Sequence, residues 1–265
     1  MINKDYLLSE LKESYFNGAF IDITKKFDIY LYAHKDRVGF NVIKENDNRI
    51  YVIYKYGNIN ESAIKDISRL FSLKFGLLEI KIIKIYKDYI FIQSDKRLEI
   101  GDFLLFEPNY FIKDDMIFGP YLDNLIGNIV IRKILLNNRN IGVQQSIDEE
   151  DKLLYSIFPK SKISFVLDVL WQDYLDEKIN LDKIYNVIGT KYKKLDSLVM
   201  ENVKNVQLKL PFKLEPDFIE NGEVIYLLCP IIGGHLPVSS VKIDTLFSYI
   251  EIVGLLINNK LGKKS

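Results

Sequence analysis

The sequence predicts an α/β protein in which a mixed β-sheet is flanked by helices and a small β-rich domain is inserted. After residue 116, hydrophobic strand-like runs alternate with amphipathic helical segments, which is typical of a sheet covered on both faces. Residues 41–115 are mostly strand-like. The 265 residues are 48% hydrophobic and 13% aromatic, which is enough for one large domain with an insert.

The elements expected before residue 116 are mainly strands. Residues 3–15 have helical spacing, and FDIYLYA at 27–33 predicts a buried strand. Further strands are expected at 38–44, 49–56, 77–86 and 89–94 and, with a Gly-Asp turn, within 98–108, and a short helix at 61–73. We therefore assign 41–115 to an inserted β-rich domain, and 1–40 together with 116–265 to a discontinuous α/β domain.

Helices and strands alternate in the rest of the chain. We expect helices at 123–138, 148–158, 195–204 and 241–261. Strands are expected at 140–147, 162–170, 206–212 and 223–231. Because the strand runs are hydrophobic throughout, the sheet they form should be buried on both faces.

Charge and cysteine content narrow the class of protein. Lys plus Arg and Asp plus Glu both number 36, which favours neither nucleic acid nor an anionic membrane as a partner. The single cysteine, Cys229, lies in the apolar run VIYLLCPII and is expected to be a buried structural thiol. The N-terminal segment lacks the apolar core of a signal peptide, and no run is long enough to span a membrane. We expect a cytoplasmic protein.

The two histidines of the chain lie in settings that suggest ligands. His34 follows a buried strand, and Asp36 two residues later could orient the imidazole or add a carboxylate. His235 follows another buried strand and two glycines, which let the backbone turn tightly and expose the side chain. A lone histidine is more often structural, so these settings, rather than the residue type, motivate the prediction.

Two aspartates share this kind of position. Asp123 begins a predicted helix and could be a simple N-cap. Asp168 lies at the end of a very apolar strand, where an unpaired charge would be costly. Sites in open α/β sheets form at the carboxyl ends of strands, where His34, Asp168 and His235 all fall. Two histidines and two aspartates suit Zn, Co or Mn.

These residues carry a resemblance to the tetrahedral aminopeptidases, a family of cocatalytic metallopeptidases often called glutamyl or leucyl aminopeptidases or endoglucanases. AHKDRVGF (33–40) resembles the family's AHMDEIGF, and FGPYLDNLIGNIVIRKILL (118–136) resembles GKALDDRIGCAVLLEVL. NIGVQQSI (140–147) resembles the TVQEEVG strand, SFVLDV (164–169) resembles AIAVDV, and the run from 231 to 256 is similar to the family's last block. The resemblance implies a zinc-aminopeptidase-like fold.

The resemblance also implies roles by position. His34, Asp123 and Asp168 match the ligands of one metal ion, with Asp123 as the bridging carboxylate. His235 matches a ligand of the second ion, and Asp36 matches the aspartate that supports the first histidine. The implied cofactor is one or two divalent ions per chain, Zn, Co or Mn.

The chain departs from the family where the catalytic glutamates are expected. Gln145 replaces the glutamate that acts as general base, and an amide has no usable basicity. Ser146 replaces a glutamate ligand of the second ion, Asn124 the second aspartate of an Asp-Asp pair, and Arg37 a glutamate. The shorter N-terminal region and insert also leave the family's dodecameric assembly open.

Three functions remain open from the sequence. The first is a degenerate, metal-binding aminopeptidase homologue with weak or no peptidase activity, acting on peptide ends or as part of a homo-oligomer or a mixed oligomer with an active homologue. The second is an active aminopeptidase in which Glu149 or Glu150 supplies the missing carboxylate, although acidic residues there could simply favour the start of a helix. The third is a structural or partner subunit without metal.

Overall fold

A six-stranded mixed β-sheet forms the centre of the larger part of the molecule. The computed structural model describes residues 4–16, 27–34, 37–59, 61–137, 140–146, 161–188, 195, 201–208 and 222–261. Within them the strand order is β10-β1-β11-β14-β12-β13. The strands are β1 (Ile29–His34), β10 (Gly142–Ser146), β11 (Ile163–Leu170), β12 (Ile184–Val187), β13 (Val203–Val206) and β14 (Glu223–Pro230). β12 runs antiparallel to β14, and the other pairs are parallel.

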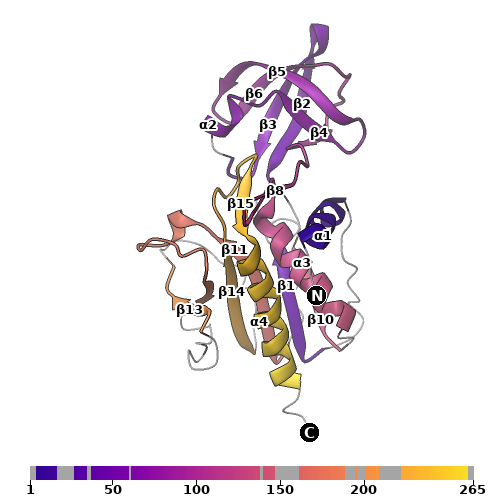
Figure 1. Ribbon diagram of the computed structural model, residues 1–265. Coiled ribbons are helices and arrows are strands. Elements are labelled where there is room, and N and C mark those ends of the chain that lie inside the picture. Colours follow the sequence, from indigo (N-terminus) through magenta and orange to yellow (C-terminus); the bar gives the residue numbers. More distant parts are fainter. Residues whose placement is uncertain are drawn as a thin grey trace.

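Both faces of this sheet are buried, as the hydrophobic strands predicted. The helices α1 (Lys4–Phe16), α3 (Leu122–Asn137) and α4 (Ile243–Leu261) belong to one side, and α3 contacts β1, β11 and both other helices (Figure 1). Leu31 and Leu167 pack into the core on that side. Tyr32 and Val166, one position away, belong to a second buried cluster, because successive side chains of a strand point to opposite faces.

The inserted residues form a closed barrel of antiparallel strands in the order β2-β3-β6-β5-β4-β7. Its strands are β2 (Gly39–Asn46), β3 (Ile50–Tyr56), β4 (Arg69–Ser72), β5 (Gly76–Tyr86), β6 (Tyr89–Ser94) and β7 (Phe103–Leu105). The strands expected at 38–44 and 49–56 are β2 and β3, which pair from Gly39 opposite Tyr56 to Asn46 opposite Ile50. The domain boundaries at 41 and 115 stay a prediction.

A small antiparallel sheet lies between the barrel and the helices (Figure 1). It consists of β8 (Phe111–Lys113), β9 (Met116–Gly119) and β15 (Ser239–Lys242) in the order β15-β9-β8. β9 leads into α3 and β15 leads into α4, so this sheet fixes where both helices begin. These three short strands were not expected from the sequence.

One predicted helix is right only in its first turn, and another is wrong in the part that the structure describes. The segment 61–73 contains only the short helix α2 (Glu61–Ile64) and then strand β4, which closes the barrel against β5 and β7. In the segment 195–204, residues 201–202 form a turn and Val203 begins strand β13, where it pairs with Ile184. Sheet pairing overrides the local helical pattern in both places. The helix expected at 148–158 lies outside the described residues.

Each of the other predicted helices and strands overlaps an observed one of the same type, including the helix at 123–138 (α3) and the strand at 162–170 (β11). The strand expected at 206–212 is described only to residue 208, and within that part only Val206 lies in a strand, as the last residue of β13. Cys229 is fully buried within β14, as expected, and burial raises the pKa of its thiol well above the ordinary value. None of the described helices is long and apolar enough to cross a bilayer.

Candidate metal centre

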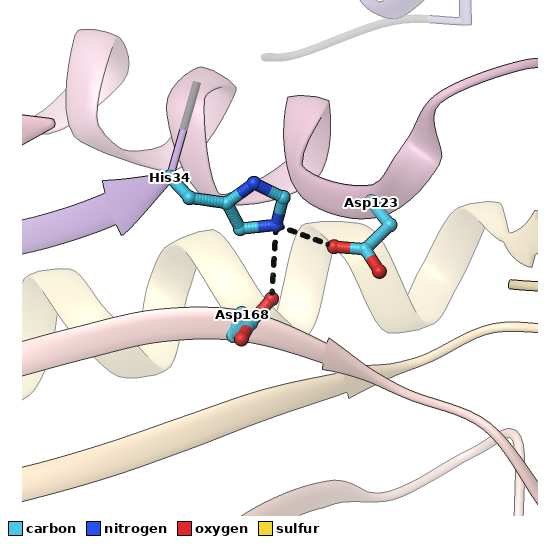
Figure 2. Close-up of side chains that lie close together, drawn as sticks. All are labelled: His34, Asp123 and Asp168. Carbon is cyan, nitrogen blue, oxygen red and sulfur yellow. Dashed lines mark hydrogen bonds and ion pairs between the residues drawn. The ribbon is translucent and has the colours of Figure 1, made fainter. Parts of the chain in front are cut away.

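Three side chains from three elements meet at the carboxyl end of the central sheet. His34 is the last residue of β1, and Asp168 lies near the end of the neighbouring parallel strand β11. Asp123 lies in the first turn of α3, which packs on both strands. Figure 2 shows the His34 ring directed at both carboxylates. The meeting of strand ends that the sequence predicted is therefore present.

Short distances join these side chains. His34 Nε2 lies 2.7 Å from Asp123 Oδ1 and 3.8 Å from Asp168 Oδ1 (Figure 2). One nitrogen and two carboxylate oxygens lie within 4.8 Å of one another. His34 is 1% exposed and Asp123 is 7% exposed, so the group is shielded from water. A nitrogen and two oxygens at this spacing suit a divalent transition metal.

His235 approaches the same centre from the other side of Asp123. Its Nε2 lies 3.4 Å from Asp123 Oδ2, so the two oxygens of this carboxylate face the two histidines of the chain. Its Nδ1 lies 3.1 Å from the carbonyl oxygen of Asn58, which fixes the ring. The backbone of His235 is left-handed, with φ of 56°, in the tight turn that follows Gly233 and Gly234.

The two imidazoles decide the ionisation of Asp123. Burial alone would raise the pKa of this carboxyl. The charges and hydrogen bonds of His34 and His235 outweigh burial and hold the pKa of Asp123 well below its usual range. Asp123 is therefore an ionised carboxylate at neutral pH, which is the form that binds a cation. An N-cap role alone would not place it between two imidazoles.

Asp168 is held by two hydrogen bonds of its own. Its Oδ2 accepts a hydrogen bond of 3.0 Å from the Tyr226 hydroxyl, and its Oδ1 accepts one of 2.8 Å from the Val169 backbone amide. Donors of this kind orient a ligating carboxylate and leave its remaining lone pairs for an ion. Asp168 thus meets the expectation that a carboxylate in an apolar strand is paired.

Two asparagines of α3 tie the helix to both ligand-bearing strands. The Asn124 amide donates to the carbonyl oxygen of Leu167 at 2.7 Å, and its Oδ1 accepts from the Gly127 amide at 2.8 Å. The Asn128 amide donates to the carbonyl oxygens of His34, at 2.8 Å, and Asn124, at 2.7 Å. Asn128 was not predicted from the sequence, although it is a polar residue in the otherwise apolar stretch LIGNIVI.

Gln145 and Ser146 lie on the strand next to His34. In the register of β1 and β10, Gln145 is paired with Ala33 and Ser146 with His34. The backbone of both residues therefore runs beside the metal-binding group, and their side chains are outside the described part of the structure. Asp36, Glu149 and Glu150 also lie outside the described residues, so their predicted roles stay predictions.

A cavity of about 480 Å³ adjoins the centre on the side of His235. Its wall includes Trp171, Ile179, Leu236 and His235 itself. The Trp171 ring lies 5.2 Å from the His235 ring, and a Cβ at Gly234 would stand 2.5 Å from the indole, so this glycine lets the indole pack on the backbone. The lining is mixed, because Asn58, Gln172 and Asp173 also contribute to it, and the volume lies within the range of clefts that bind small molecules.

Comparisons with known proteins support the fold. No family model matches the chain, and no curated protein matches it in sequence. Among solved structures, a TET aminopeptidase from Thaumarchaeota archaeon SCGC AB-539-E09 has a TM-score of 0.70 at 14% identity, over 96% of this chain and 89% of that one. The TET1 peptidase of Pyrococcus horikoshii has a TM-score of 0.67 at 13% identity, over 96% and 92%. An endoglucanase from Thermotoga maritima has a TM-score of 0.64 at 13% identity, over 95% and 90%. The chain therefore has the fold of the TET aminopeptidases and of the endoglucanase-like structures that resemble them.

Proposed function

We propose that this protein is a degenerate metallo-aminopeptidase homologue, which binds a divalent metal ion and has weak or no ordinary peptidase activity. The observation that carries the proposal is the convergence of His34, Asp123 and Asp168 on one point. These are the residues that the sequence resemblance matched to metal ligands. The same resemblance assigns the lost general base to Gln145, on the strand beside His34.

The residues of this chain would hold the metal ion and bind a ligand, but Gln145 would not accept a proton from water. His34, Asp123 and Asp168 would hold Zn, Co or Mn, and Asp123 with His235 would be the first two ligands of any second ion. A bound ion supplies Lewis-acid polarisation of a carbonyl group. The cavity beside His235 could take the end of a peptide. The amide of Gln145 has no basic lone pair with which to accept a proton from water.

An assembly of several chains also belongs to this proposal. The TET1 peptidase of Pyrococcus horikoshii can assemble into a tetrahedron or a large octahedral shell. A shared fold supports an oligomer here, formed by this chain alone or mixed with an active homologue in the cytoplasm. Analytical ultracentrifugation of the purified chain tests the homo-oligomer, and a monomer would leave the mixed oligomer to be tested by co-expression.

Metal content and a gain-of-function variant test the proposal. Elemental analysis of the protein purified without chelator should find Zn, Co or Mn, and the ion should be lost in Asp123→Ala. Hydrolysis of aminoacyl substrates should be near background in the wild type and should rise about 10²–10⁴-fold in the double variant Gln145→Glu/Ser146→Glu, the contribution typical of a positioned general base. Gln145→Asn/Ser146→Gln is the control without new carboxylates.

Three results would contradict the proposal. Strong hydrolysis by the wild type that persists in Glu149→Ala/Glu150→Ala would show an active enzyme with another base. Hydrolysis that is lost in that variant, while the protein stays folded, would establish a relocated carboxylate. A protein that neither contains nor takes up any of the three ions would instead be a structural or partner subunit.

A further inference from the structure

We infer that this chain holds a single divalent ion, between His34, Asp123 and Asp168, and that His235 contacts the ligand in the neighbouring cavity instead of completing a second metal site. The inference rests on the proposed function and deepens it. It fixes the number of ions, and it assigns His235 a role different from the ligand role that the resemblance implied.

The first site has a full set of protein ligands. A catalytic zinc site has three protein ligands and an open position. His34 Nε2, one oxygen of Asp123 and one of Asp168 make three, and they come from β1, α3 and β11. Asp168 is also oriented by the Tyr226 hydroxyl. This group is the only one of three or more His, Cys, Asp or Glu side chains at ligand spacing within the described residues.

Among the described residues, the second site has two protein ligands instead of three. Asp123 Oδ2 and His235 Nε2 are 3.4 Å apart, a spacing that would suit two ligands of one ion. The distance alone would therefore allow a second ion at this position. The number of protein ligands argues against it, because two are fewer than zinc sites normally have. The sheet register places position 146 beside His34, where a third ligand could come from, and the residue there is a neutral serine.

Charge leads to the same conclusion. The carboxylates of Asp123 and Asp168 together balance one divalent ion. A second divalent ion would add two positive charges next to Asp123, which is 7% exposed, without a further carboxylate among the described residues of this group. Uncompensated charge in a shielded site is unfavourable. Ser146, which stands in place of the family's glutamate, therefore weakens the second site in two ways. The site loses a ligand, and it loses a negative charge.

His235 is well placed for contact with a bound molecule. Its ring is fixed on one edge by the Asn58 carbonyl oxygen and packs near the indole of Trp171. It also forms part of the cavity wall. A ring held between a backbone carbonyl and the Asp123 carboxylate is rigid, and it can position a ligand without an ion of its own.

Native mass spectrometry of the full-length chain, titrated with Zn²⁺ alone, tests the inference. The wild type should bind one ion per chain. His235→Gln should still bind one ion, and His34→Gln should bind none. Ser146→Glu should bind two, because it supplies the missing ligand and charge. The size-matched control Ser146→Gln should bind one, and Ser146→Glu/His235→Gln should return to one. Circular dichroism melting confirms that each variant is folded.

The outcomes separate this inference from the proposed function. Two ions of comparable affinity in the wild type, or loss of the ion in a folded His235→Gln protein, would overturn the single-ion inference and leave the metal-binding proposal standing. A wild type that binds no ion would overturn both. A Ser146→Glu protein that still binds one ion would show that position 146 does not complete a second site and would overturn the ligand-count argument.

Discussion

The residues of the candidate metal centre depend on buried or partly buried side chains that are not proposed as metal ligands themselves. Asn128 uses both hydrogens of its amide, one for the carbonyl oxygen of His34 and one for that of Asn124. Asn124 in turn binds the carbonyl oxygen of Leu167, the residue before Asp168. The backbone of each ligand is therefore linked to the other two through α3. Such outer contacts hold ligands at binding distance.

Replacing Asn128 should weaken metal binding more than it weakens the fold. Asn128→Leu keeps the size of the side chain and removes both hydrogen bonds, so we expect the Kd for Zn²⁺ to rise about 10–100-fold. Isothermal titration calorimetry measures this change. Ile134→Val on the same helix, which removes one buried methyl group, should cost about 0.5–1.5 kcal/mol of stability without changing the Kd. An unchanged Kd in a folded Asn128→Leu protein would show that Asn128 has no positioning role.

At the residue scale the sequence predicted His34, Asp123, Asp168 and His235 as a group, and the structure brings all four together. Each of them is an unusual polar residue at a strand end or a helix start, so a single sequence can reveal it. Asn128 was missed because an asparagine in an amphipathic helix is common. Its importance depends on the carbonyl group of His34, which is 94 residues away.

At the scale of elements, the start of α3 is packed tightly against β11. Gly127 lies where the helix meets the strand, and a Cβ there would stand 2.8 Å from the carbonyl oxygen of Leu167 and would also overlap the Asn124 side chain. Gly254, in the middle of α4, would place a Cβ 3.5 Å from Ile134 Cδ1, an ordinary contact. The two glycines therefore differ in what surrounds them, although both lie in long helices.

The two glycines should respond to alanine in opposite ways. Gly127→Ala should destabilise the protein by roughly 1–3 kcal/mol, because the strand and the helix must move apart. Gly254→Ala should be neutral or stabilise it by up to about 1 kcal/mol, because alanine favours the helix. Urea denaturation of both variants gives the two free energies of unfolding. A neutral Gly127→Ala would mean that α3 and β11 are less tightly packed than the described contacts require.

Elements with long hydrophobic patterns were predicted well, and short ones were not. The strands β1, β11 and β14 are buried on both faces, so their sequences are apolar throughout. β4 has four residues, and only its pairing with β5 and β7 makes it a strand. β13 likewise depends on β12. Sequence patterns record local preference, and pairing with distant segments decides the short elements.

At the scale of the whole molecule, the metal ion would cross-link parts of the chain that are far apart in sequence. Its three ligands lie on β1, α3 and β11, on either side of the inserted barrel in the chain. An ion that binds only the folded state stabilises it by mass action. Metal binding should therefore be visible as global stability, independently of any activity.

Thermal melting should report this linkage. At free Zn²⁺ about one hundred times the Kd, the gain is about 2.7 kcal/mol. For a chain of this size that gain corresponds to a rise in Tm of roughly 5–10 °C over protein treated with chelator. Differential scanning calorimetry measures both melts. Asp123→Ala should show no such rise, and an equal rise in that variant would locate the bound ion elsewhere.

The sequence by itself determined the α/β class and the buried Cys229, and it predicted the β-rich insert and the four residues proposed as metal ligands, because burial and strand ends leave local marks in a sequence. Only the tertiary structure decided that the insert closes into a barrel and that Asp123 lies between His34 and His235. It also revealed the asparagine bonds that join α3 to both ligand-bearing strands. These features are contacts between segments distant in sequence, and the physical reason they escaped prediction is that no local pattern encodes the partner of a side chain.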